Sequence, residues 1–336
     1  MKNADYLTGI TTSGTPHLGN FVGAIRPAVK TSKDKNLISY YFLADYHSLI
    51  KCQDPERVKK STLEIAAAWI ALGLDTNNCI FYRQSDIPEI PELTWILTCV
   101  TPKGLMNRAH AYKANVDENI NSGKPDLDQN ISMGLFSYPI LMAADILMFN
   151  AKKVPVGKDQ IQHLEMTRDI AAKFNNQYTE LFTYPQVVVD ETSSVLAGLD
   201  GRKMSKSYNN TIPLFDTEKR LIKLIMKIQT NSQGPDEPKD YKTCTLFSIF
   251  EAFAMENEIK TMKERYINGI SWGTMKQELF EYINEVLKEP RNKYAELISS
   301  PSDIEIILKK GKDKAREYSV PFLSKIRKAT GIQSLA

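Results

Sequence analysis

Short apolar runs rich in β-branched and aromatic residues alternate with helical patterns over the first half of the chain. Residues 38–43 (ISYYFL) are almost continuously apolar, which is typical of a strand buried on both faces of a parallel sheet. A helix begins near residues 54–56 (DPE), where Asp suits the N-cap and Pro the first turn. It ends at Gly73, and residues 79–82 form the next strand. This order predicts an α/β fold with a doubly wound parallel sheet.

The rest of the chain divides into a continuation of this pattern and a purely helical part. Residues 154–157 and 187–189 are further predicted strands, and Pro27 is expected to kink or end the first helix early. Helical patterns cover residues 91–113, 134–149 and 158–174, whereas the polar residues 115–130 indicate an exposed, mobile excursion. Beyond residue 216 strand signals stop, and we expect helices at about 217–229, 245–256, 258–268, 272–288, 290–299, 302–311 and 314–329.

The composition is that of an ordinary globular protein. The 336 residues carry a formal net charge of +3, which does not by itself indicate a nucleic-acid binder. The four cysteines are far apart in sequence and form no CxxC pair, so we expect neither a zinc nor an iron–sulfur site. The start of the chain lacks the apolar core of a signal peptide, and the apolar run 135–149 is too short to span a bilayer. We therefore expect a cytoplasmic protein that does not bind a membrane.

The first motif lies at residues 6–20 (YLTGITTSGTPHLGN), which predict a strand, a turn and the start of a helix. A helix N-terminus presents unpaired backbone N–H groups and suits an anion such as phosphate. Gly14 and Gly19 would let the backbone approach a ligand closely, and His17 adds a ring N–H donor. The motif alone is equally compatible with an ordinary strand-turn-helix.

The second motif is Lys203-Met204-Ser205-Lys206-Ser207, two lysines in a loop of small polar residues. Alone, such a pair is usually a solvated loop. Together with residues 16–20 (PHLGN), however, it resembles the two signature motifs of class I aminoacyl-tRNA synthetases. Residues 138–147 (YPILMAADIL), 154–160 (VPVGKDQ) and 162–169 (QHLEMTRD) are similar to the tryptophanyl-tRNA synthetase family, and the resemblance covers roughly residues 5–210.

The resemblance implies a Rossmann-type catalytic domain over residues 1–212, with a helical insertion at about 91–150 as dimer interface. An anticodon-binding helical domain then covers residues 213–336. The implied activity is ATP-dependent activation of L-tryptophan and its transfer to tRNA(Trp), releasing AMP and pyrophosphate, by a homodimer that does not bind DNA. Mg²⁺ would be held by the phosphates of ATP, with no metal ligand from the protein.

The resemblance also implies site residues. Lys203, Lys206 and His17 are the expected catalytic residues, because positioning and charge neutralisation must supply most of the acceleration in adenylate formation. The expected ATP-binding set is Thr11, Thr12, Ser13, His17, Gly19, Asn20, Gly157, Lys158, Asp159, Val195, Lys203, Met204, Ser205, Lys206 and Ser207. Thr11, Thr12 and Lys158 depart from the family pattern. A further phosphate-binding cation corresponds to Arg108 or to Lys113, and the spacing does not distinguish them.

The tryptophan pocket is expected to contain Leu7, Gly9, His47, Met142, Asp145, Ile146, Val154, Val156 and Gln160. Asp145 lies in an otherwise apolar helix, where an unpaired carboxylate would be costly, so it is either a satisfied structural group or the acceptor of the indole N–H. Tyrosyl-tRNA synthetase is the nearest competitor, but apolar Leu7 stands where that family carries a tyrosine. A small-molecule adenylyltransferase would share the helix mouth, and a non-enzymatic RNA-binding paralogue would share the fold. Neither of them explains His17 together with both lysines.

Overall fold

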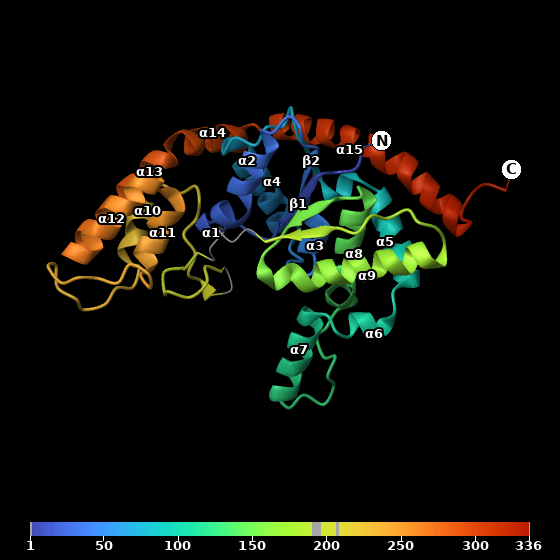
Figure 1. The fold of residues 1–336 in the computed structure, drawn as a ribbon, viewed down its shortest axis with the longest axis horizontal. Coiled ribbons are helices and arrows are strands. Elements are labelled where there is room, and N and C mark those ends of the chain that lie inside the picture. The colour runs from blue at the N-terminus through green and yellow to red at the C-terminus, as the bar shows by residue number, and fades with distance from the viewer. Residues whose placement is uncertain (1, 190–195, 206–207, 336) are drawn as a thin grey trace.

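A parallel sheet of five strands, in the order β3-β2-β1-β4-β5, forms the centre of the first half of the chain (Figure 1). The computed structural model describes residues 2–189, 196–205 and 208–335. The strands are β1 (Tyr6–Thr11), β2 (Ser39–Ala44), β3 (Ile80–Arg83), β4 (Lys153–Pro155) and β5 (Gln186–Val188). The predicted α/β class and parallel sheet are confirmed.

Both faces of the sheet are covered, as the apolar run in β2 predicts. All six residues of β2 are buried. Tyr41 and Leu43 pack into one core with Trp69, whereas Tyr40 and Phe42 pack into a second core on the opposite face. This alternation follows the two-residue period of a strand.

The helices of the first half connect these strands. Their bounds are α1 (Leu18–Asn20), η1 (Phe21–Ile25), α2 (Arg26–Ser32), α3 (Asp45–Ser48), α4 (Pro55–Ala71), η2 (Gln84–Asp86), α5 (Glu89–Val100), α6 (Lys103–Met106), α7 (His110–Asn121), α8 (Met133–Met148), η3 (Lys158–Gln160) and α9 (Ile161–Gln177). Asp54 caps α4 by accepting from the backbone N–H groups of Glu56 and Arg57, as predicted. In Figure 1, α7 projects away from the sheet on the side of α6.

Two local predictions differ from the structure. The helix that contains Pro27 continues to Ser32, because a π-helical turn, η1, precedes the proline and Pro27 falls in the first turn of α2, where no N–H is needed. The polar excursion 115–130 is helical as far as Asn121. There the Asn119 side chain donates to the carbonyls of Leu127 and Gln129, at 2.8 and 2.9 Å, and ties the following loop to the helix.

The second half is helical, with α10 (Glu218–Met226), α11 (Thr245–Phe253), α12 (Glu256–Asn268), α13 (Trp272–Val286), α14 (Lys288–Ser299) and α15 (Pro301–Thr330). The predicted pair 302–311 and 314–329 is wrong, because a single helix, α15, covers both. Gly311, at the end of the first predicted helix, lies inside this helix. A Cβ at Gly311 would lie 1.7 Å from the carbonyl oxygen of Phe81 in β3, so the glycine allows helix and strand to touch.

The last helix therefore returns to the sheet (Figure 1). Charged pairs join it to β3 and to α5. Glu305 accepts from Arg83 at 2.8 Å, and Arg316 donates to Glu89 at 2.8 Å. Arg327 donates to Glu92 at 2.6 Å. Part of the basic character of this helix is thus neutralised within the chain.

Candidate active site

The first motif forms a helix mouth at the carboxyl end of β1. His17, which is mostly buried, is the N-cap residue of α1. Its backbone N–H donates to the side-chain oxygen of Asn20 at 3.0 Å. A Cβ at Gly19 would lie 3.1 Å from two atoms of the His17 ring. Gly19 thus makes room for the imidazole of His17 beside the helix start, and its expected close approach to a ligand stays a prediction.

The second motif lies against the first. Met204 is the next neighbour of Gly19, 3.6 Å from the ideal Cβ position. Downstream, the backbone N–H of Leu18 donates to the Ile212 carbonyl at 3.0 Å, and that of Leu214 donates to Pro16 at 2.9 Å. The structure therefore brings together two motifs that are far apart in sequence. Val195, Lys206 and Ser207 lie outside the described residues.

Asn210 shapes the loop that carries Lys203, although no sequence motif pointed to it. Its Oδ1 accepts from the Ser205 backbone N–H at 2.8 Å, and its Nδ2 donates to Asp200 at 2.7 Å and to the Lys203 carbonyl at 3.1 Å. The Asn210 side chain also fills the space in front of Gly198, where a Cβ would be 2.4 Å away. This buried amide fixes the backbone on both sides of the lysine.

The loop after β4 faces the same region. Gly157, Lys158 and Asp159 are exposed. Nearby protein atoms that displace water raise the pKa of Asp159, but the hydrogen bond from Gln160 and the positive charge of Lys203 outweigh them and hold this pKa below its usual value. Lys203 and Asp159 are therefore close enough to influence each other, and three segments of the chain meet around the helix mouth.

Thr11, Thr12 and Ser13, at the end of β1 and the start of the turn, differ in how accessible their hydroxyls are to a ligand. Thr12 is fully buried, and its hydroxyl lies 2.8 Å from that of Ser48. Thr11 is exposed and Ser13 is half-buried. The Thr12 side chain is thus already engaged inside the fold, whereas the hydroxyls of Thr11 and Ser13 are accessible.

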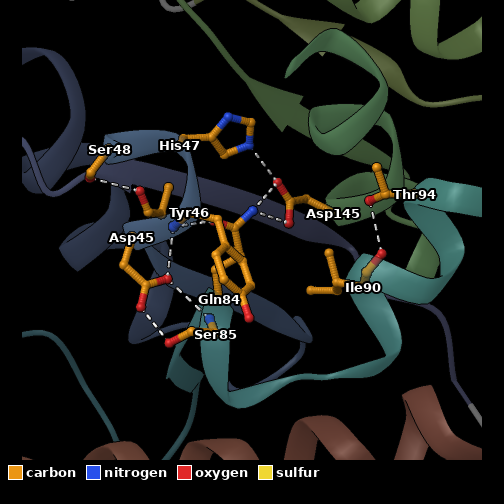
Figure 2. A network of polar contacts seen from close by, with 10 residues as sticks. Asp45, Tyr46, His47, Ser48, Gln84, Ser85, Ile90, Thr94 and Asp145 are labelled. Atoms are coloured by element: carbon orange, nitrogen blue, oxygen red, sulfur yellow. Dashed lines mark hydrogen bonds and ion pairs between the residues drawn. The ribbon is translucent and has the colours of Figure 1, made fainter. Parts of the chain in front are cut away.

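A second polar group lies inside the apolar part of the site, around Asp145 (Figure 2). Asp145 is only 1% exposed and comes from α8. His47 Nε2 lies 2.9 Å from its Oδ2, and Gln84 Nε2 lies 2.8 and 2.9 Å from its two oxygens. Burial raises the pKa of Asp145, while the hydrogen bonds from His47 and Gln84 act in the opposite direction. Two residues expected in the tryptophan pocket, His47 and Asp145, are therefore in direct contact.

The expected apolar walls belong to the core around this group. Leu7, Ile146 and Val154 are buried, and Met142 and Val156 are half-buried; all five belong to the same core as Phe42 and Tyr82. The nearest side chain to Gly9 is that of Phe42. A Cβ there would lie 2.4 Å from the Phe42 ring, so Gly9 makes room for that ring.

A chain of hydrogen bonds connects the exposed loop to the pocket. Gln160 donates to Asp159 at 2.9 Å and faces His163 Nδ1 at 2.8 Å, and His163 Nε2 lies 2.8 Å from the Tyr138 hydroxyl. The Tyr138 ring in turn packs edge-on against His47. Neither His163 nor Tyr138 belongs to the expected site residues. The spacing of Gln160 and His163, about one helical turn apart, is the signal that could have found the contact.

The described residues contain no cluster of three or more His, Cys, Asp or Glu that could hold a metal ion.

Arg108 and Lys113 flank the start of α7, and the His110 backbone N–H donates to Gln162 at 2.8 Å, which connects the helical insertion to α9. In the part of the chain that the structure describes, no helix combines the length and apolarity needed to cross a bilayer.

Comparison with known proteins gives a consistent result. The family model described as tRNA synthetases class I (W and Y) matches residues 1–288. The tryptophan–tRNA ligase of Neisseria meningitidis is 54% identical over 335 residues and covers 100% of both chains. That of Pseudomonas aeruginosa is 54% identical over 98% of this chain and 74% of its own length. The crystal structure of tryptophanyl-tRNA synthetase from Campylobacter jejuni, complexed with ADP and tryptophan, superposes with a TM-score of 0.86 at 44% identity, covering 97% of this chain and 99% of the other. The helix mouth, the lysine loop and these full-length relatives lead to one conclusion: this chain belongs to the class I tRNA synthetases of the tryptophan and tyrosine (W and Y) family.

Proposed function

We propose that the protein is a tryptophan–tRNA ligase, which activates L-tryptophan with ATP and transfers it to tRNA(Trp). The observation that carries the choice of amino acid is Leu7, which is buried and apolar where tyrosyl-tRNA synthetases carry a tyrosine, and which packs in the same core as Ile146 and Val154. Asp145, a buried carboxylate beside these apolar walls, can accept from the indole N–H. Relatives with 54% identity that carry the name tryptophan–tRNA ligase support the same choice.

In the first step, a carboxylate oxygen of tryptophan attacks the α-phosphorus of ATP, and the bond to the bridging oxygen of pyrophosphate breaks. The carboxylate is already a nucleophile, so the reaction requires no general base. His17 and the backbone near Gly19 and Asn20 would hold the phosphates and the adenosine end of ATP. Lys203 and Lys206 would neutralise the charge that develops on pyrophosphate, together with Mg²⁺ brought in by ATP.

In the second step, a terminal hydroxyl of tRNA attacks the carbonyl carbon of the adenylate, an ester bond forms, and AMP leaves. We assign recognition of the anticodon to the helical region 213–336 and catalysis to residues 1–212. The contacts of Ile212 and Leu214 with the first motif support a boundary close to the ATP site.

We also infer that the active protein is a homodimer that joins through the insertion 91–150. This insertion exposes large apolar side chains, with Trp95 at 68%, Met133 at 72% and Ile120 at 53% exposure. Isolated apolar side chains are common on surfaces, but several on one segment favour an interface. The four cysteines are unpaired, which suits the cytoplasm. Light scattering on the purified chain tests the dimer: a monomeric mass would refute it.

The test of function is ATP–pyrophosphate exchange measured with each of the twenty amino acids in turn. We expect exchange with tryptophan and none above background with tyrosine. Exchange supported by tyrosine alone would refute the choice of amino acid, and no exchange with any amino acid would refute the ligase assignment. Charging of tRNA(Trp) with labelled tryptophan then tests the second step.

A further inference from the structure

Gln84 occupies a position that the proposed function does not use. It follows β3 directly, at the carboxyl end of the sheet, and it is fully buried. Its Oε1 accepts from the backbone N–H of Tyr46 at 3.1 Å, and its Nε2 faces both oxygens of Asp145 (Figure 2). A backbone N–H can only donate, so the amide oxygen must face Tyr46 and the NH₂ group must face Asp145. The orientation of the amide is therefore fixed.

The segment that carries Gln84 is held on both sides. Arg83 donates to Asp86 at 3.0 Å and to Glu305 of α15 at 2.8 Å. The Ser85 backbone N–H donates to Asp45 at 3.0 Å, and its hydroxyl also donates to that carboxylate. A side chain whose neighbours are locked in this way is held close to one geometry before a ligand arrives.

The contacts with the Gln84 amide help Asp145 to act as a hydrogen-bond acceptor. An ionised carboxylate accepts only, whereas a protonated one also donates. Asp145 is buried, and among the described residues only Gln84 donates to both of its oxygens. Without those contacts the buried carboxyl group would favour its neutral form or turn toward His47. In both cases it would offer a poorer acceptor to an N–H group in the pocket.

We propose that Gln84 is a positioning residue that sets specificity: it holds Asp145 as an oriented acceptor, so that the pocket prefers a ring carrying an N–H over the same ring without one. The proposal rests on the proposed function, in which Asp145 accepts from the indole N–H. Sites built to pair a buried polar group of the substrate reject analogues that lack this group far more strongly than purely apolar pockets do.

The experiment compares tryptophan with benzothienylalanine, in which sulfur replaces the indole N–H, in the pyrophosphate exchange assay. For the natural chain we expect kcat/KM to favour tryptophan by about 100-fold or more. In Gln84→Met the preference should fall to below about 10-fold, because tryptophan loses most and the sulfur analogue little. The KM for ATP should stay the same. Gln84→Glu keeps the acceptor for Tyr46 but places a second carboxyl group against Asp145. The two carboxyl groups then share one proton, so Asp145 is no longer a fixed ionised acceptor and the preference should fall as well.

Asn175→Asp is the matched control. Asn175 is also an amide that accepts from backbone N–H groups, those of Leu181 and Phe182, and donates to a carbonyl, but it lies in α9 and ties that helix to the following loop. Its loss should lower stability and leave the preference unchanged. If the natural chain shows exchange with tryptophan and both Gln84 variants keep the preference for tryptophan over the sulfur analogue, the role of Gln84 is refuted and the proposed function stands. No exchange in the natural chain refutes the proposed function and this inference together, and a weak preference in the natural chain refutes the N–H contact itself.

Discussion

The close approach between α15 and the sheet makes a sharp prediction for Gly311→Ala. The added Cβ would stand 1.7 Å from the Phe81 carbonyl oxygen and 2.5 Å from its carbon. A carbon and an oxygen in contact need about 3.3 Å, so the helix must move away from β3 by roughly 1.6 Å. A gap of even about 1 Å forfeits about half of the dispersion attraction of the atoms that face it.

The residues that lose contact are those one turn away on the same face of the helix, Leu308 and Ala315, together with the Phe81 backbone. Both side chains are buried. Overpacking at a single site usually lowers the free energy of unfolding by about 1–3 kcal/mol. Because the backbone obstacle cannot rotate away, we expect a loss at the upper end of this range, about 3 kcal/mol.

Equilibrium unfolding in urea, followed by tryptophan fluorescence, measures this loss. Trp69 is buried and stacks on the Phe81 ring with centroids 5.7 Å apart, so the signal reports on the strand that must move. Gly273→Ala is the control. Gly273 lies in α13, and a Cβ there would meet only Oγ of Ser271, at 3.9 Å. It should be neutral or stabilising by up to about 1 kcal/mol. A loss below about 1 kcal/mol in Gly311→Ala would refute the idea that a glycine is required for this contact.

Further predictions concern the lysine loop and the contact between α15 and α5. Lys206→Ala should lower tryptophan-dependent exchange by about 100-fold or more with little change in stability, because charge on the leaving pyrophosphate is no longer neutralised; near-normal exchange contradicts its role. Asn210→Ala frees the backbone around Lys203 and should lower kcat for exchange by about 10-fold while KM for tryptophan stays constant, which steady-state kinetics can separate. The hydrogen bonds from Arg327 lower the pKa of Glu92, so this pair adds stability above the unfolded-state value of 4.5 and loses it as the pH falls through the lower folded-state value. Glu92→Gln should therefore be less stable than the natural chain at pH 7, by about 0.5 kcal/mol for so exposed a pair. In urea titrations the two should converge as the pH falls below 4.5, and a difference that is constant with pH contradicts the assignment.

The sequence was sufficient for the strands, because β2 and β3 consist of apolar runs whose burial on both faces leaves few other arrangements. It failed where a tertiary contact decides the local structure. Gly311 is a helix breaker by propensity, yet the backbone of Phe81 requires a glycine at that place in α15. Asn119 likewise extends α7 through bonds to a loop that cannot be read from local composition.

For the site as well, local motifs could be predicted from the sequence, whereas residues that depend on distant contacts could not. Motifs with fixed spacing, around His17 and Lys203, were visible in the sequence, and the structure brings them together. Gln84 and Asn210 were missed because a buried amide has no local signature; its partners come from distant segments. The one available signal for Gln84 is its place directly after a strand, since polar residues at the carboxyl ends of parallel strands commonly face a ligand.

The position of α15 also has a consequence for the order of events during synthesis. Strand β3 is at the edge of the sheet, and the helix that packs on it begins only at Pro301, so it is made long after the strand. At a synthesis rate of about 5–20 residues per second, the roughly 220 residues between them take about ten seconds or more to appear. Throughout that time the nascent sheet keeps an uncovered apolar surface. A ribosome that stalls before residue 301 would therefore leave an incomplete protein with that surface open to aggregation or to chaperones, even though both signature motifs had already been made.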